Sequence, residues 1–155
     1  MKEVNILKDE IRRYFKRSTV AFLATADGTQ PRVRPVSLIY CERAFWVATI
    51  TSDAKVKQLR KNEKVELCYI INGRRKDRNK GYIRITGIAR ITRSKKERKK
   101  IAREIPFFKV FWQHTDDPSY TLLKIRVREV EYLRSEEFTA IRLPWKRSDT
   151  EYAKK

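Results

Sequence analysis

The fold is decided by residues 20–61, VAFLATADGTQPRVRPVSLIYCERAFWVATITSDAKVKQLRK. Three runs that are rich in β-branched and aromatic residues each predict a strand, at residues 20–25, 33–40 and 44–51. The first two runs are joined by Ala-Asp-Gly-Thr at residues 26–29, which is a hairpin signal because Asp-Gly tolerates positive φ. This part of the chain therefore predicts an antiparallel meander.

The meander is followed by SDAKVKQLRK, residues 52–61, whose apolar spacing predicts a helix. Ser52 is a preferred N-cap residue, and Val56 and Leu59 form the stripe that is expected to be buried. Because Ser52 comes directly after the third strand, we expect the helix N-terminus to lie at the end of that strand.

A candidate phosphate site lies at this junction of strand and helix. Arg34 is in the second strand, Thr49 is near the end of the third, and Lys55 is in the first helical turn. Arginine can bind two phosphate oxygens at once, lysine acts as a point charge, and the N–H groups at a helix start favour anions. The alternative is that Arg34 and Lys55 are ordinary surface cations among the 38 Lys and Arg of the chain.

The rest of the chain predicts a barrel. Its periodicity predicts two helices, at residues 4–15 and 94–104. It also predicts three further strands, at residues 65–71, 82–92 and 121–133. Gly87, inside one of these strands, indicates a bulge or a close backbone approach. The tail from about residue 135 is expected to be irregular. The whole chain, residues 1–155, is therefore expected to be one mainly β domain, a small antiparallel barrel with flanking helices.

Composition limits where the protein is expected to act. Hydrophobic residues make up 41% of the chain, which is enough for a core despite a mean hydropathy of −0.68. No run approaches the roughly 18 apolar residues that span a bilayer, and the charged N-terminus lacks the apolar core of a signal peptide. We therefore expect a cytoplasmic protein with no membrane contact. Its high Lys, Arg and Glu content with few Gly is typical of a thermophile.

The sequence predicts no metal site and assigns no catalytic residue. Cys41 and Cys68 form no Cys-x-x-Cys pair and His114 is the one histidine, so a zinc site would lack ligands. We expect both cysteines to be reduced, in or near the core, and His114 to be an ordinary loop residue. No Ser-His-Asp or paired-carboxylate arrangement stands out.

The net charge of +19 is extreme and unevenly distributed. Residues 72–103 hold fourteen cations and only two carboxylates, Asp77 and Glu97. This basic segment has three interpretations: a solvated face, a surface that recruits an anionic substrate or a polyanionic cofactor such as deazaflavin F420, or a nucleic-acid surface. Nucleic acid is disfavoured because Tyr82 is the one aromatic residue among these cations, and single-strand binding needs stacking platforms.

Several motifs, taken in order, resemble the pyridoxamine 5′-phosphate oxidase-like family, the FMN-binding split barrels. The resemblance rests on Asp27-Gly28, Pro31, Arg34, Val36, Phe45, Thr49, Lys55 and Asn62. Residues 81–87 resemble the family's penultimate barrel strand, and residues 107–112, FFKVFW, with Asp117-Pro118 look like its general-stress-protein branch. The resemblance covers roughly residues 6–133 and implies a six-stranded antiparallel split barrel.

This resemblance also implies a homodimer with two FMN molecules at the subunit interface. Arg34 and Lys55 would hold the FMN phosphate. The residues implied to add phosphate donors at the helix start are Ser52 and the backbone of Asp53 and Ala54. The residues implied to line the isoalloxazine edge are Val36, Ser37 and the backbone around Thr49.

Four positions of the implied site need separate comment. Tyr82 stands where many relatives carry a Gln that reaches the flavin. Trp112 and Trp145 are candidates for packing on the flavin from the partner chain, the alternative being an aromatic core. Asp53 departs from the Ser or small residue of many relatives. Its carboxylate would repel a phosphate unless it turns away or serves the helix N-terminus.

The sequence therefore predicts an FMN-binding flavoprotein, an oxidoreductase that acts on an unidentified small-molecule substrate. In such a protein the cofactor carries the redox chemistry and the chain positions it. One alternative is an F420-dependent reductase on the same fold. The other, from a different class, is a non-enzymatic basic barrel that binds nucleic acid.

Overall fold

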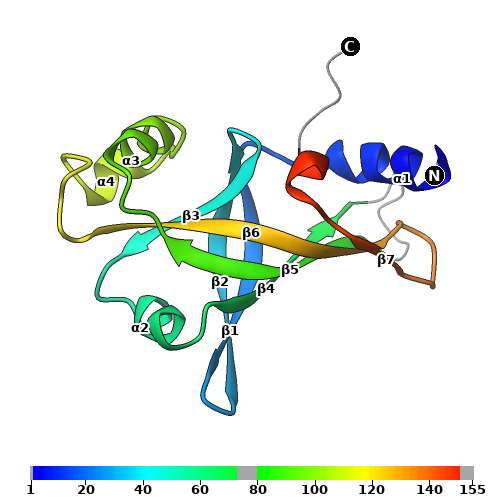
Figure 1. Cartoon of the computed structure of the whole chain (residues 1–155), viewed down its shortest axis with the longest axis horizontal. Helices are drawn as coiled ribbons and strands as arrows, with labels where there is room; N and C mark the ends of the chain where they lie inside the picture. Colours follow the sequence, from blue (N-terminus) through cyan, green and yellow to red (C-terminus); the bar gives the residue numbers. More distant parts are fainter. Residues whose placement is uncertain (1, 73–79, 151–155) are drawn as a thin grey trace.

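Six antiparallel strands close into a barrel in the computed structural model, which describes residues 2–72 and 80–150 (Figure 1). They follow one another in the order β3-β2-β1-β4-β5-β6, and β6 pairs with β3 to complete the ring. Their bounds are Thr19–Asp27 (β1), Gln30–Cys41 (β2), Ala44–Ile50 (β3), Lys64–Ile71 (β4), Gly81–Ile91 (β5) and Tyr120–Leu133 (β6). The predicted barrel is confirmed, and each of its predicted strands is present.

The hairpin that begins the meander has the predicted turn. β1 and β2 pair in continuous register from Thr19 opposite Leu38 to Asp27 opposite Gln30. Gly28 adopts a φ of 60°, a value that glycine reaches without strain.

Gly87 lies where the register of β5 against β6 shifts, between Thr86 and Gly87. A Cβ atom at Gly87 would lie 2.3 Å from the carbonyl oxygen of Arg126 on β6. The predicted bulge with a close backbone approach is therefore confirmed.

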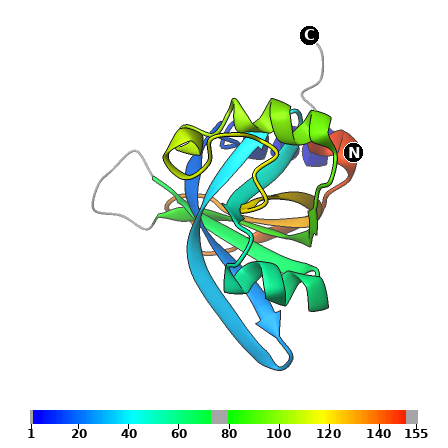
Figure 2. The ribbon, with the colours of Figure 1, turned by 90° about the vertical axis from the view of Figure 1, so that its left-hand side faces the viewer.

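The described residues form four α-helices around the barrel: α1 (Lys2–Arg12), α2 (Ala54–Lys61), α3 (Lys95–Ala102) and α4 (Phe108–Phe111). Figure 2 shows α3 and α4 together on one side of the barrel and α2 well apart from them. Ser94 caps α3 by accepting a hydrogen bond from the backbone N–H of Glu97. Across residues 2–72 and 80–150, the helices are too short or too polar to cross a bilayer.

Apolar side chains pack in two layers. Alternate residues of the strands point inward and fill the barrel, as expected from the period of two in a strand; examples are Leu23, Leu38, Leu67, Ile85 and Val130. A second cluster lies between α3, α4 and the outer side of β3 and β6; it includes Trp46, Ile101, Phe108, Trp112 and Tyr120.

Within residues 135–150, part of the tail that was expected to be irregular forms regular structure. A seventh strand, β7 (Ile141–Pro144), pairs with β6, and a 3₁₀ helix follows at Arg147–Thr150. Trp145 is only 3% exposed, and Asp149 accepts a hydrogen bond from Lys8 of α1 at 2.7 Å. This order comes from contacts with β6 and α1, which are distant in sequence and leave no local signal.

The basic segment is partly neutralised where it is described. Arg84 pairs with Glu66 at 2.8 Å and with Glu131 at 2.6 Å, and Arg90 pairs with Glu63 at 2.9 Å. Residues 73–79, which contain four of the cations, lie outside the described residues. Whether this segment recruits an anionic partner therefore stays a prediction.

Candidate functional site

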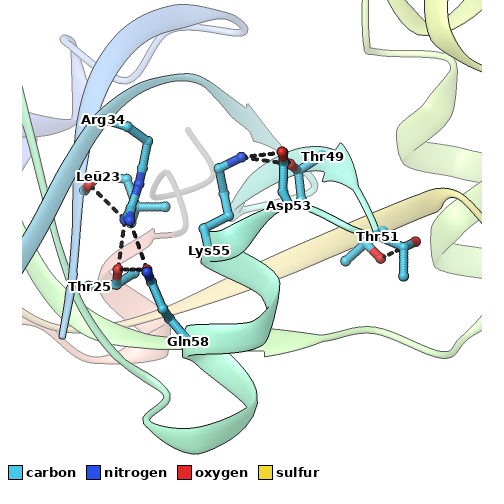
Figure 3. A network of polar contacts seen from close by, with 9 residues as sticks. Leu23, Thr25, Arg34, Thr49, Thr51, Asp53, Lys55 and Gln58 are labelled. Carbon is cyan, nitrogen blue, oxygen red and sulfur yellow. Dashed lines mark hydrogen bonds and ion pairs between the residues drawn. The ribbon is translucent and has the colours of Figure 1, made fainter. Parts of the chain in front are cut away.

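Arg34 is held by polar side chains of β1 and α2 (Figure 3). Its guanidinium donates to Thr25 Oγ1 at 2.7 Å and to Gln58 Oε1 at 2.8 Å. A longer hydrogen bond of 3.4 Å reaches the carbonyl oxygen of Leu23. Within residues 2–72 and 80–150, no carboxylate lies within ion-pair distance of Arg34.

The Arg34 charge is partly removed from water. Burial lowers the pKa of Arg34, and the positive charge on Arg32 lowers it further, whereas Asp53 acts in the opposite direction. A guanidinium nevertheless stays protonated at neutral pH. The result is a fixed positive charge that lacks a carboxylate in contact, which is the electrostatic condition for binding an anion.

Lys55 belongs to a second cluster at the start of α2. Its ammonium donates to Thr49 Oγ1 at 2.8 Å and to Asp53 Oδ2 at 2.5 Å, and the Thr49 hydroxyl also donates to Asp53 Oδ2. Burial by itself would raise the pKa of Asp53, but hydrogen bonds from Lys55 and Thr49 outweigh it and lower the pKa below its usual value. Asp53 is therefore ionised at neutral pH.

The two clusters adjoin each other. Lys55 and Gln58 are three residues apart on α2, so their side chains lie on the same helix face, and Gln58 contacts Arg34 directly. The described site thus contains two cations and one carboxylate, and it keeps a net positive charge.

The helix begins at Ala54, two residues after the start of the predicted segment 52–61, and Ser52 is not its N-cap. The N-cap position belongs to Asp53, whose carbonyl oxygen accepts the N–H groups of Val56 and Lys57. The turn that closes β3, in which the Asp53 N–H donates to the Ile50 carbonyl, fixes this start. Ser52 lies outside the helix and is exposed.

The Asp53 side chain does not cap the helix either, because its carboxylate turns to Lys55. The first-turn N–H groups of α2 therefore receive no capping side chain. Orphan N–H groups of this kind are available to a ligand.

The remaining predicted site residues are placed less favourably. Val36 is 9% exposed and belongs to the barrel core, Ser37 is half-buried, and Ala54 is exposed at the helix start. Tyr82 lies on β5 and donates its hydroxyl to Glu131 Oε1 at 2.6 Å, so this hydroxyl is already bonded within the chain.

Both candidate tryptophans are buried in their own chain. Trp112 is 2% exposed and packs on Phe108 and Tyr120 of the apolar cluster between α3, α4, β3 and β6. Trp145 is 3% exposed and lies beside Phe15. This placement favours the aromatic-core interpretation for both.

Sequence reasoning missed Thr25 and Gln58, which orient Arg34. Thr25 occupies an inward position of β1, two residues after Leu23, and is 3% exposed. Gln58 lies on the buried side of α2 and is 8% exposed. These two residues could have been found in the sequence, because each is a polar residue at a position where the strand or helix period predicts an apolar one.

The comparisons with known proteins agree with this fold. The sequence profile of the family described as pyridoxamine 5′-phosphate oxidase matches residues 7–134, which is most of the chain, so the chain belongs to that family. The search of curated proteins gives no match.

Solved structures share the fold at low sequence identity. General stress protein 26 from Bacillus anthracis is 23% identical with a TM-score of 0.69, over 88% of this chain and 98% of that chain. A NimC/NimA family protein from Clostridium acetobutylicum is 21% identical with a TM-score of 0.72, over 92% and 94%. An FAD-binding protein from Mesorhizobium loti is 19% identical with a TM-score of 0.61, over 81% and 89%.

Proposed function

We propose that the protein binds FMN non-covalently and acts as a flavin-dependent oxidoreductase. The observation that supports this most is Arg34, which contacts no carboxylate among the described residues and lies next to Lys55 and the start of α2. Family membership supports it as well. A bound flavin supplies hydride or electron transfer, and the side chains of the site bind and orient it.

The residues fit a phosphate monoester. The guanidinium of Arg34 is already oriented by Thr25 and Gln58, so its remaining N–H groups can bind phosphate oxygens without a further ordering cost. The first-turn N–H groups of α2 add donors and a partial positive charge.

The experiment is a titration of FMN into the purified chain. The FMN band at roughly 450 nm, which is set by the cofactor itself, is expected to stay with the chain after unbound FMN has been removed by gel filtration. Lys55→Ala is expected to weaken FMN binding about tenfold to a hundredfold, because a charge-assisted bond contributes about 1.5–3 kcal/mol. Arg34→Ala is expected to weaken it to a similar extent.

The matched control is Lys57→Ala, which removes an exposed cation from the same helix. Its FMN affinity should equal that of the wild-type chain. Each variant also removes partners within the chain, Thr25 and Gln58 in Arg34→Ala and Thr49 and Asp53 in Lys55→Ala, so the two are interpreted together. Unchanged affinity in both variants would refute the phosphate assignment, and tighter binding of F420 than of FMN would favour the F420-dependent alternative.

We also propose that two copies of the chain associate through the outer side of β2, β1 and β4. Four apolar side chains on these adjacent strands are exposed, namely Val33 (65%), Val20 (65%), Phe22 (47%) and Ile70 (58%). An exposed apolar surface on neighbouring strands is typical of a protein interface. A homodimer that holds FMN at its interface is the assembly that the family resemblance implies.

A further inference from the structure

Asp53 occupies the donors that a phosphate would need. Its Oδ2 atom accepts from both Thr49 and Lys55, so the two side-chain donors at the start of α2 are directed at a carboxylate of the chain itself. The Lys55 side chain is only 14% exposed in this arrangement, whereas that of Asp53 is 43% exposed. Lys55 is therefore the more buried member of this ion pair.

A phosphate and the Asp53 carboxylate compete for hydrogen bonds from the Lys55 ammonium. Both are acceptors with negative charge, and like charges side by side disfavour each other. Arg34 differs from Lys55, because its partners Thr25 and Gln58 are neutral and no carboxylate of residues 2–72 or 80–150 contacts it. An incoming phosphate can therefore meet Arg34 first and must then displace the Asp53 carboxylate from Lys55.

The outward path for Asp53 is open. Its side chain is the more exposed partner of the ion pair, and it makes no capping hydrogen bond that would hold it at the helix. A carboxylate released from Lys55 can be hydrated, which keeps the cost of displacement moderate.

We propose that Asp53 competes with the phosphate of the flavin for Lys55 and Thr49, so that flavin is an exchangeable ligand of this protein instead of a permanently bound group. This inference rests on the proposed function. In the absence of flavin, Asp53 closes the site by neutralising Lys55. When flavin binds, Lys55 exchanges the Asp53 carboxylate for the phosphate. The affinity for flavin then gains only the difference in free energy between the Lys55–phosphate and the Lys55–Asp53 interactions.

The experiment compares two ligands and three chains. FMN and riboflavin, which lacks the phosphate, are titrated into the wild-type chain, Asp53→Asn and Asp53→Ser, with flavin fluorescence as the readout. Both variants are expected to bind FMN at least about two- to fivefold more tightly, because each removes the partly exposed Asp53 charge that repels the phosphate. Their riboflavin affinity should stay at the wild-type value, and FMN dissociation measured by stopped flow should be slower by a similar factor.

Glu3→Gln provides the matched control, since it removes one exposed carboxylate from α1, far along the chain from the site. If FMN binds equally to the wild-type chain and to both Asp53 variants, the competition is refuted while the proposed function stands. If riboflavin binding tightens as much as FMN binding, the effect does not come from the phosphate and the inference fails. Absence of FMN binding in all three chains would overturn both proposals.

Discussion

Two buried tyrosines of β6 differ in whether their hydroxyl group has a hydrogen-bond partner. The Tyr132 hydroxyl donates to Glu10 of α1 at 2.7 Å, whereas the Tyr120 hydroxyl is buried with no partner in the described part of the chain. Burial raises the pKa of Tyr120 to about 12, so its hydroxyl stays protonated at neutral pH. The two side chains have nearly the same burial, 1% exposed in each case, and differ in hydrogen bonding.

Phenylalanine should therefore have opposite effects at these positions. Tyr120→Phe removes an unsatisfied hydroxyl and is expected to leave the free energy of unfolding unchanged or to raise it by about 1 kcal/mol. Tyr132→Phe loses a charge-assisted bond and is expected to lower it by about 1.5–3 kcal/mol. Urea unfolding of both variants checks this, and a loss of stability in Tyr120→Phe would mean that its hydroxyl is satisfied.

At the residue scale, the sequence was sufficient to place Arg34 in a strand and Lys55 in the first turn of a helix, and insufficient to predict their side-chain partners. The two cations follow from a strand-to-helix order that is local in the chain. The contact of Arg34 with Thr25 and Gln58 depends on where α2 lies against the barrel, which no local pattern encodes. The direction of the Asp53 carboxylate, toward Lys55, depends on the turn after β3 in the same way.

At the scale of elements, Glu131 joins three strands. It lies on β6, is 6% exposed, and accepts hydrogen bonds from Tyr82 of β5 and from Arg142 of β7, while Arg84 of β5 forms an ion pair with it. The short strand β7 was missed because four residues carry little pattern, and its position depends on such contacts with β6. The hairpin at Gly28 and the bulge at Gly87 were predictable because glycine marks each one locally.

Loss of the Glu131 charge is expected to weaken the attachment of β7 to β6. It should also make the free energy of unfolding depend less on pH in the acidic range. Burial would raise the pKa of Glu131, but hydrogen bonds from Tyr82, Arg142 and Arg84 outweigh it and lower the pKa below the usual 4.5. The stabilisation is therefore complete above about pH 4.5 and is lost as the pH falls through the lower folded-state value.

Glu131→Gln is expected to lower the free energy of unfolding by about 1–2 kcal/mol at pH 7, a value reduced because both arginines are partly exposed. Its stability should also fall less than that of the wild-type chain below pH 4.5. Asp116→Asn, which removes an exposed carboxylate from another part of the chain, is the control and should leave both quantities unchanged. Chemical unfolding between pH 3 and pH 7 measures them, and identical curves for Glu131→Gln and the wild-type chain would contradict the prediction.

At the scale of the whole molecule, strong charge and exposed apolar surface occur together. A net charge of +19 disfavours association by repulsion. The exposed side chains of Val20, Phe22, Val33 and Ile70 favour it over one face. Association is expected to bring these apolar side chains together and to strengthen with ionic strength, since salt screens the repulsion.

Phe22→Glu is expected to convert the proposed dimer into a monomer, because it places a charge at the centre of the apolar face. Light scattering coupled to size-exclusion chromatography measures the mass of the particle. Val110→Glu changes a side chain of α4 that is 78% exposed and lies outside this face, so it should leave the mass unchanged. A wild-type chain of 18.6 kDa in solution would contradict the dimer.

The pairing of β3 with β6 has a consequence for the order in which the chain folds. Thr49 pairs with Thr121, and the ladder that closes the barrel joins segments separated by some seventy residues of intervening chain. During synthesis, the hairpin of β1 and β2 can form early, but its inner apolar side chains stay uncovered until β6 has left the ribosome. Long-range pairing of this kind slows folding, and partly folded β structure is prone to aggregation. The nascent chain is therefore expected to be most prone to aggregation in the interval between the emergence of β3 and that of β6.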